Sequence, residues 1–69
     1  MDRIAVTSSN IASVGYDEPS QTLEVEFVDG NIYDYYGVGP LTYSALMSAG
    51  SVGSYFYRNV RTSYVFGEV

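Results

Sequence analysis

The stretch from Thr22 to Val38, TLEVEFVDGNIYDYYGV, predicts a β-hairpin and with it the fold. In its first half, Thr22–Val28, apolar side chains alternate with glutamates, which is the period of a strand with one buried face. Asp29-Gly30 then turns the chain into a second strand, Ile32–Val38. The hairpin therefore supplies two adjacent antiparallel strands on which the remaining elements can pack.

The length of the turn decides which side chains of the second strand face the core. A two-residue turn would place Asp34 inside, opposite Val25. A three-residue loop with its glycine in the left-handed region pairs Val25 with Tyr33 instead. That register puts Tyr33 and Tyr35 on the apolar face and leaves Asp34 outside, opposite Glu24. Burying a carboxylate costs more than an exposed pair of like charges, so we expect the three-residue loop and a solvated acidic outer face.

Two segments before the hairpin predict further strands, and the segment after it predicts a helix. Ile11–Tyr16 alternates in the same way and predicts a third strand, whereas Met1–Thr7 predicts a short edge strand or an ordered arm. Pro40 suits the first position of a helix, because its missing N–H is no loss there. The apolar stripe of that helix is expected to comprise Leu41, Ala45 and Ala49, with Leu46 beside them.

A second short helix is expected next, followed by a closing strand. Ser51 can cap this helix, whose apolar face repeats every four residues at Val52, Phe56 and Val60. Tyr64–Phe66 is expected to return to the sheet. The elements together predict an α+β fold, in which a small antiparallel sheet (a three-stranded meander plus a return strand) packs with two short helices.

Composition excludes most catalytic chemistry. The 69 residues include eight Asp and Glu against three arginines, with no lysine, histidine or cysteine, so the net charge is -5. No imidazole base, thiolate or amine nucleophile exists, and no carboxylate pair in a cleft is evident. Asp29-Gly30-Asn31 lacks the ligand spacing of a calcium loop. We therefore expect a non-enzyme without cofactor or metal.

Size and hydropathy bear on assembly and location. A core of this size seldom supplies more than about 3–5 kcal/mol, and the chain has neither disulfides nor a zinc site to add to it. Self-association is the remaining common source of stability, so we expect a homo-oligomer. No apolar run approaches the roughly 18 residues of a membrane span. We expect a cytoplasmic protein with no membrane partner.

A set of short motifs runs through the chain in a specific order: Ser8-Ser9-Asn10-Ile11, Ser13-Val14-Gly15-Tyr16-Asp17, Leu23–Phe27, Gly30, Tyr33-Asp34-Tyr35, Gly37-Val38, Pro40, Tyr43, Leu46, Ser51, Gly53, Tyr55-Phe56, Arg61 and Tyr64. From about Val6 to Val69 this set resembles the KTSC domain family, named for its occurrence at the C-terminus of some lysyl-tRNA synthetases. The resemblance implies a single KTSC-like domain over residues 1–69. It also implies a family of mostly short stand-alone bacterial and phage proteins, for which RNA binding has been suggested.

The sequence departs from the family pattern in ways that bear on nucleic-acid binding. Tyr57, Val65 and Gly67 stand where Asn, Pro and a basic residue are usual, and lysine is absent. Three arginines in a chain of net charge -5 cannot neutralise many phosphates, which argues against binding of long nucleic acids. A small nucleotide carries few charges, and two arginines can hold it.

Aromatic and cationic side chains favour a nucleotide-type ligand or a short RNA. Bases stack on aromatic rings at about 1–3 kcal/mol each, and phosphates bind to arginine forks. By analogy with other small phage and bacterial domains, such a protein could sequester a nucleotide signal of host defence. The candidate ligand-binding residues are Arg58, Arg61, Tyr35, Tyr55, Tyr57, Ser8, Ser9 and Asn10.

A second interpretation remains open. Tyrosines in a small domain often belong to the core with the hydroxyl at its rim, and an arginine at a helix end meets the helix dipole favourably. Exposed tyrosines on an acidic surface also suit a protein interface, and the charge speeds encounter with a basic partner. The chain would then be an acidic protein-interaction module or a phage-type inhibitor of a host protein. Its active face would comprise Asp17, Glu24, Glu26 and Asp34.

Overall fold

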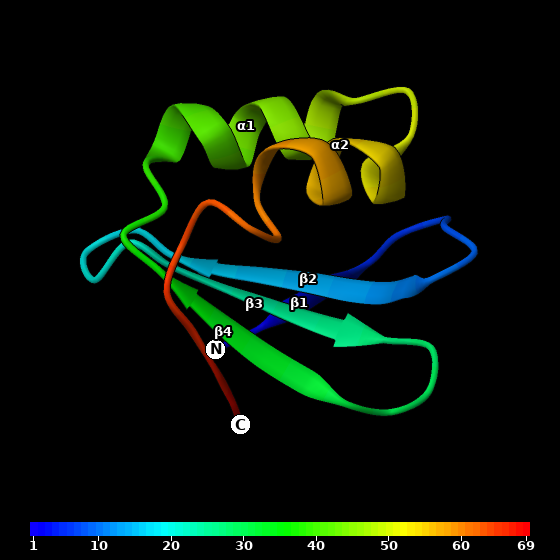
Figure 1. Ribbon diagram of the computed structural model, residues 1–69, viewed down its shortest axis with the longest axis horizontal. Helices are drawn as coiled ribbons and strands as arrows, with labels where there is room; N and C mark the ends of the chain where they lie inside the picture. The colour runs from blue at the N-terminus through cyan, green and yellow to red at the C-terminus, as the bar shows by residue number, and fades with distance from the viewer.

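The computed structural model describes all 69 residues and places both helices on one face of an antiparallel sheet (Figure 1). Five strands lie in the sheet in their sequence order: β1 (Arg3–Ala5), β2 (Ile11–Asp17), β3 (Thr22–Phe27), β4 (Ile32–Tyr36) and β5 (Phe66–Glu68). Two helices, α1 (Pro40–Ser48) and α2 (Val52–Asn59), connect β4 to β5. The predicted α+β class is confirmed.

The sheet has one strand more than a meander with a return strand. Residues Arg3–Ala5 pair with β2 in a regular antiparallel register, with Ile4 opposite Val14, so the N-terminal segment is a strand rather than an arm. The closing strand also lies two residues later than expected. Its pairing with β4 begins with Phe66 opposite Tyr35.

The central hairpin has the predicted three-residue loop. Gly30 has a φ of 94°, and the Phe27 N–H donates to the Asn31 carbonyl at 2.9 Å. Val25 pairs with Tyr33, and Glu24 pairs with Asp34. The predicted register is therefore confirmed, and it turns Tyr33 toward the helices.

Strand β2 contains a β-bulge that the alternation of its side chains did not predict. Ile11 pairs with Phe27 and Ser13 pairs with Glu26, so the β2 side has one residue more than the β3 side. Ile11 and Val14 are both fully buried although three positions separate them. The extra residue shifts the inward–outward alternation by one position. Ile11 and Val14 can therefore both face the core, whereas side chains three positions apart in a regular strand point to opposite faces.

The two helices differ in how well their buried faces were predicted. Leu41 is 85% exposed, so the predicted stripe of α1 is wrong, and Leu46 is the residue that α1 buries. Tyr43, which flanks the predicted stripe, accounts for this orientation of α1: its ring stacks on the ring of Tyr16, with 4.5 Å between the ring centres. In α2, the Ser51 side chain accepts from the Ser54 N–H as a cap, as predicted.

The core lies between the sheet and the helices, with Phe56 of α2 at its centre. Phe56 is fully buried, and its ring lies 5.2 to 5.7 Å from three others, those of Phe27, Tyr35 and Tyr57. Neither helix is long and apolar enough to cross a membrane. The buried hydrophobic residues are Ile11, Val14, Leu23, Val25, Tyr35, Val38, Leu46, Phe56 and Val60.

Candidate ligand-binding site

Two adjoining hollows open beside α2. The larger one, here called the aromatic hollow, has a volume of about 520 Å³. The smaller one, the polar hollow, has a volume of about 270 Å³. Tyr57 lines both hollows and is the one residue they share. The aromatic hollow is lined by Phe27, Asp29, Asn31, Tyr33, Tyr35, Tyr57, Arg61, Thr62 and Phe66. The polar hollow is lined by Ser8, Ser9, Asn10, Ser51, Gly53, Ser54, Tyr57 and Arg58.

The aromatic walls follow from the hairpin register and from β5. Because Tyr33 and Tyr35 face the helices, their rings meet Phe66, which β5 brings alongside β4. The ring of Phe66 lies 5.9 Å from that of Tyr33 and 5.4 Å from that of Tyr35. Phe27 contributes a further edge, with its ring 5.9 Å from that of Tyr33. Four rings from three strands thus form one apolar surface.

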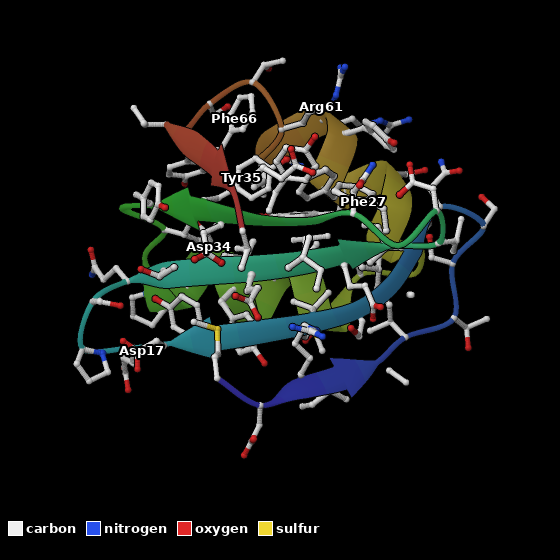
Figure 2. All side chains as sticks on the ribbon, turned by 90° about the horizontal axis from the view of Figure 1, so that it is seen from below. Asp17, Phe27, Asp34, Tyr35, Arg61 and Phe66 are labelled. Atoms are coloured by element: carbon white, nitrogen blue, oxygen red, sulfur yellow. The ribbon has the colours of Figure 1, made fainter.

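The aromatic hollow also carries a cation and a protonated phenol. The Arg61 guanidinium carbon lies 5.5 Å from the centre of the Tyr57 ring, a cation–π distance. Burial and the neighbouring Tyr33 raise the pKa of the Tyr35 hydroxyl, against the opposing effect of Arg61. Tyr35 therefore remains a hydrogen-bond donor at neutral pH. Figure 2 shows Tyr35, Phe66 and Arg61 along one margin of the molecule, beside α2.

Both arginines of the site are free of internal ion pairs. The chain has one ion pair, between Arg3 and Glu24, on the opposite face of the sheet. Arg58 and Arg61 are exposed and have no carboxylate within pairing distance. Arg58 lies in the last turn of α2, and Arg61 lies two residues beyond the helix end rather than within it. Their guanidinium groups can therefore bind an external anion without breaking an ion pair of the fold.

The polar hollow depends on a close approach of the Ser8 side chain to the backbone of α2. A Cβ at Gly53 would lie 2.9 Å from Ser8 Oγ, so a side chain at this position would displace the Ser8 hydroxyl. Ser8 Oγ accepts from the Asn10 and Ile11 N–H groups at 3.3 Å each, which orders this turn. In Figure 1 the β1–β2 loop, the α1–α2 turn and the β3–β4 loop lie at the same end of the molecule.

Seven of the eight predicted ligand-binding residues line one of the hollows. Ser8, Ser9, Asn10 and Arg58 line the polar hollow, Tyr35 and Arg61 line the aromatic hollow, and Tyr57 lines both. Tyr55 lines neither, because its half-buried ring packs against the core. Sequence reasoning missed the contributions of Phe27, Asp29, Asn31, Thr62, Phe66, Ser51, Gly53 and Ser54. The hairpin register was the available signal for Phe27, since it places that ring on the same face as Tyr33.

Family comparison bears directly on this arrangement. The KTSC domain family matches residues 7–64, which is most of the chain. The chain belongs to the KTSC domain family. The crystal structure of a KTSC domain protein from Yersinia pestis superimposes with a TM-score of 0.96 at 32% identity, over 99% of this chain and 96% of that one. The superposition therefore covers the sheet, both helices and the backbone around the two hollows.

Relatives of this KTSC domain include stand-alone proteins and part of a larger enzyme. An uncharacterised protein of Stutzerimonas stutzeri is 46% identical over 56 residues, which cover 81% of this chain and 79% of the relative. A lysine–tRNA ligase of Nostoc punctiforme is 31% identical over 61 residues, which cover 88% of this chain but 11% of the ligase. The resemblance to a domain found in such ligases is confirmed.

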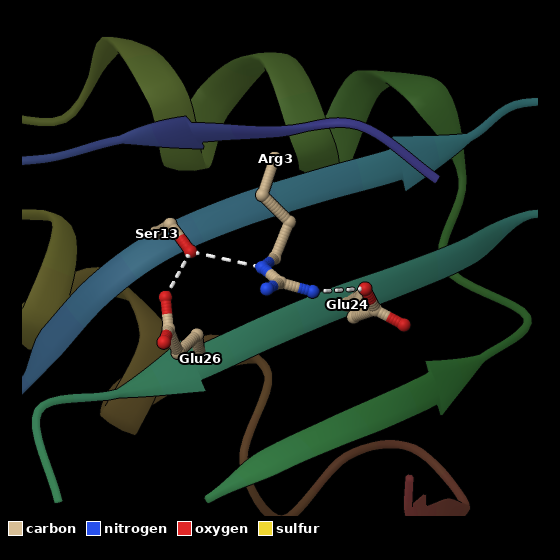
Figure 3. A network of polar contacts seen from close by, with 4 residues as sticks. All are labelled: Arg3, Ser13, Glu24 and Glu26. Carbon is tan, nitrogen blue, oxygen red and sulfur yellow. Dashed lines mark hydrogen bonds and ion pairs between the residues drawn. The ribbon is translucent and has the colours of Figure 1, made fainter. Parts of the chain in front are cut away.

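The carboxylates of the outer sheet face do not form the solvated acidic surface that was expected. Glu24 is 9% exposed, because Arg3 of β1 lies across it and donates to its carboxylate at 2.7 Å. Arg3 also donates to Ser13 Oγ at 3.0 Å, and Ser13 in turn donates to Glu26 at 2.7 Å (Figure 3). Asp17, at the end of β2, lies apart from Asp34 (Figure 2). The proposed acidic face is therefore divided and partly neutralised.

Asp34 lies beside Glu24 on this face, with its Oδ1 buried and without a hydrogen-bond partner. Burial, followed by the hydrogen bond and charge of Glu24, raises the pKa of Asp34 to about 6. Burial alone would raise the pKa of Glu24 as well, but its contacts with Asp34 and Arg3 lower that pKa. The two carboxyl groups therefore compete for one proton near neutral pH.

Asp34→Asn is expected to raise the free energy of unfolding at pH 7 by on the order of 1 kcal/mol. Asp34 holds its proton to a higher pH in the native state than in the unfolded chain. Its stabilising contribution to the free energy of unfolding is therefore fully present below about pH 4 and is lost as the pH rises through about 6. The asparagine cannot ionise, and its amide can donate to Glu24. Urea titrations of both proteins at pH 4 and pH 7 measure the difference.

The exposed Glu18 in the β2–β3 turn provides the control for this prediction. Glu18→Gln also removes one negative charge, but without removing a neighbour of Glu24. A stability difference between Asp34→Asn and wild type that is equal at pH 4 and pH 7 would contradict the assignment. A gain of the same size for Glu18→Gln would attribute the effect to net charge alone.

Proposed function

We propose that this KTSC domain is a non-catalytic binding domain for a nucleotide or a short RNA end. The base stacks in the aromatic hollow, and a phosphate lies beside Arg58 and Arg61. One observation carries the proposal: Tyr57 joins a hollow of aromatic rings to a hollow of hydroxyl groups, and each hollow contains an unpaired arginine. Ring faces and arginine forks are the two groups that recognise nucleotides without reading a long sequence.

Size and charge support a small ligand rather than a long polymer. The aromatic hollow, at about 520 Å³, lies within the range of small-molecule sites. Two free arginines in a chain of net charge -5 match the few charges of a nucleotide, whereas a long nucleic acid needs many phosphate contacts. The chain has no histidine, cysteine or lysine for acid–base or nucleophilic chemistry, which is why we propose binding rather than turnover.

A sequestering role and self-association extend this proposal. A cytoplasmic domain that binds a nucleotide without converting it can lower the free concentration of a nucleotide signal, including one used in bacterial or phage defence. A homo-oligomer would multiply the sites on one particle, and the small core is consistent with a need for such stabilisation. The division of the acidic outer face by Arg3 gives the alternative, an interface for a basic protein, less support.

A thermal-shift screen tests the proposal. Purified protein is melted with nucleoside mono- and diphosphates, cyclic dinucleotides and short RNA oligonucleotides. Ligand at a hundredfold excess over Kd increases the free energy of unfolding by about 2.7 kcal/mol, so the melting temperature should rise by several degrees. Tyr57→Ala should remove the shift, whereas Tyr36→Ala, a similarly exposed tyrosine that lines neither hollow, should preserve it. A cooperative melt unchanged by every member of the panel would contradict the proposed function.

A further inference from the structure

The rim of the aromatic hollow is chemically unequal on its two sides. Arg61 and Thr62 stand on the helix side, whereas Asp29 and Asn31 stand on the hairpin side. One aromatic-lined hollow therefore includes a cation from the segment after α2 and a carboxylate from the hairpin loop. In the proposed function the helix side meets the phosphate, which leaves the hairpin side to meet the edge of the base.

The hairpin loop holds the Asp29 carboxylate in place. Its Oδ1 accepts from the Asn31 N–H at 3.0 Å, and its Oδ2 accepts from the Asn31 side-chain amide at 3.2 Å. An ionised carboxylate has about four lone-pair sites, so each oxygen can still accept another hydrogen bond. The second amide hydrogen of Asn31 also remains free. The rim thus offers two neighbouring acceptor oxygens with one donor beside them.

Among the common bases, only guanine matches this order of groups. Its Watson–Crick edge carries two adjacent N–H donors, at N1 and the N2 amine, followed by the O6 acceptor. A carboxylate accepts such paired donors as it accepts the paired N–H groups of an arginine fork. Adenine and cytosine present ring-nitrogen acceptors next to a single amine, and uracil presents one N–H between two carbonyls. Each of these would set an acceptor against the carboxylate.

We propose that the aromatic hollow selects guanine, with N1–H and N2–H donating to Asp29 and O6 accepting from the Asn31 amide. This inference rests on the proposed function, because it names the base that the same site takes. Stacking on the rings is indifferent to base identity, since every base has a π-face. Asp29 is thus the specificity-determining residue, and the arginines contribute affinity for every nucleotide alike.

Isothermal titration with the 5′-monophosphates of guanosine, inosine, adenosine and uridine tests the assignment. Inosine keeps N1–H and O6 but lacks the N2 amine, so it isolates one of the two bonds to Asp29. We expect guanosine monophosphate to bind at least tenfold more tightly than adenosine or uridine monophosphate, with inosine monophosphate between them. This comparison uses the wild-type protein and therefore does not depend on the folding of any variant.

Asp29→Asn provides the second arm, with Asp17→Asn as its matched control. The side-chain carbonyl of the substituted residue can still accept from the Asn31 N–H, which keeps one of the two loop hydrogen bonds, but one carboxylate oxygen is replaced by a donor. We expect Asp29→Asn to reduce the preference for guanosine over adenosine monophosphate to threefold or less, without lowering the affinity for adenosine monophosphate. Asp17 also accepts hydrogen bonds within a turn, from Ser20, and lines neither hollow, so Asp17→Asn should keep the preference.

The possible failures are distinguishable. Equal, Arg61-dependent affinity for all four monophosphates would overturn guanine selection and leave the proposed function standing. Guanine selection would also be overturned if adenosine monophosphate bound more tightly than guanosine monophosphate, or if the guanine preference survived Asp29→Asn. No binding of the four monophosphates, together with no response to any nucleotide or RNA of the thermal-shift panel, would overturn the proposed function and this inference together.

Discussion

Phe56→Ala is expected to leave most of the protein unfolded at 25 °C. Phe56 is fully buried, and its ring is the shared neighbour of Phe27, Tyr35 and Tyr57, so its removal opens a cavity between α2 and the sheet. A Phe→Ala change in a core costs about 3–5 kcal/mol. A core of this size seldom supplies more than about 3–5 kcal/mol in total, so the loss is comparable to the whole stability.

Circular dichroism against temperature and urea measures this effect, with Phe56→Leu as the matched variant. Leucine refills much of the volume, and hydrophobic swaps of similar size usually cost less than about 1.5 kcal/mol. We therefore expect Phe56→Leu to fold and melt cooperatively at a lower temperature than wild type. If Phe56→Ala melted cooperatively with a loss below about 1 kcal/mol, the central role of this ring in the core would be wrong.

Arg58→Ala/Arg61→Ala is expected to weaken nucleotide binding by at least a hundredfold while leaving the fold intact. Hydrogen bonds to charged groups contribute about 1.5–3 kcal/mol each, so two lost arginine–phosphate contacts amount to about 3 kcal/mol or more. Both side chains are exposed and form no ion pair, and the contact of Arg61 with Tyr57 is worth about 0.5–1 kcal/mol at an exposed site. Titration calorimetry with 5′-nucleoside monophosphates measures the loss.

The third arginine separates a local contact from a general effect of charge. Arg58→Ala, Arg61→Ala and Arg3→Ala each lower the net charge by one, but Arg3 lies on the outer sheet face, paired with Glu24. Arg3→Ala should reduce stability and leave the affinity of the folded protein nearly unchanged. Equal weakening by all three single variants would mean that net charge governs binding, and the assignment of the phosphate position would then fail.

Residue type indicated several members of the candidate site, including Ser8–Asn10 and Tyr35, but only residues close in sequence could be predicted to lie together. Tyr57, Arg58 and Arg61 follow one another at the end of α2, and their clustering could be inferred from helix spacing. The opposite walls come from Phe27, thirty residues before Tyr57, and from Phe66, which follows Arg61 closely but reaches the site only by pairing with β4. Their positions depend on which strand pairs with which, and no local pattern reports that. Tyr55 shows the limit of such spacing, because Ser54 and Tyr57 line the polar hollow while the ring of Tyr55 packs against the core.

The sequence by itself determined the central hairpin, its register and the cap of α2. Alternation in β3, a glycine at the third position of the loop and a serine before α2 act through neighbours within four residues, so they can be read without a fold. Only the tertiary structure decided that Glu24 and Asp34 are shielded rather than solvated. For Glu24 the physical reason is that β1, from the start of the sequence, places Arg3 across the outer face, and burial depends on all the segments that meet at a point.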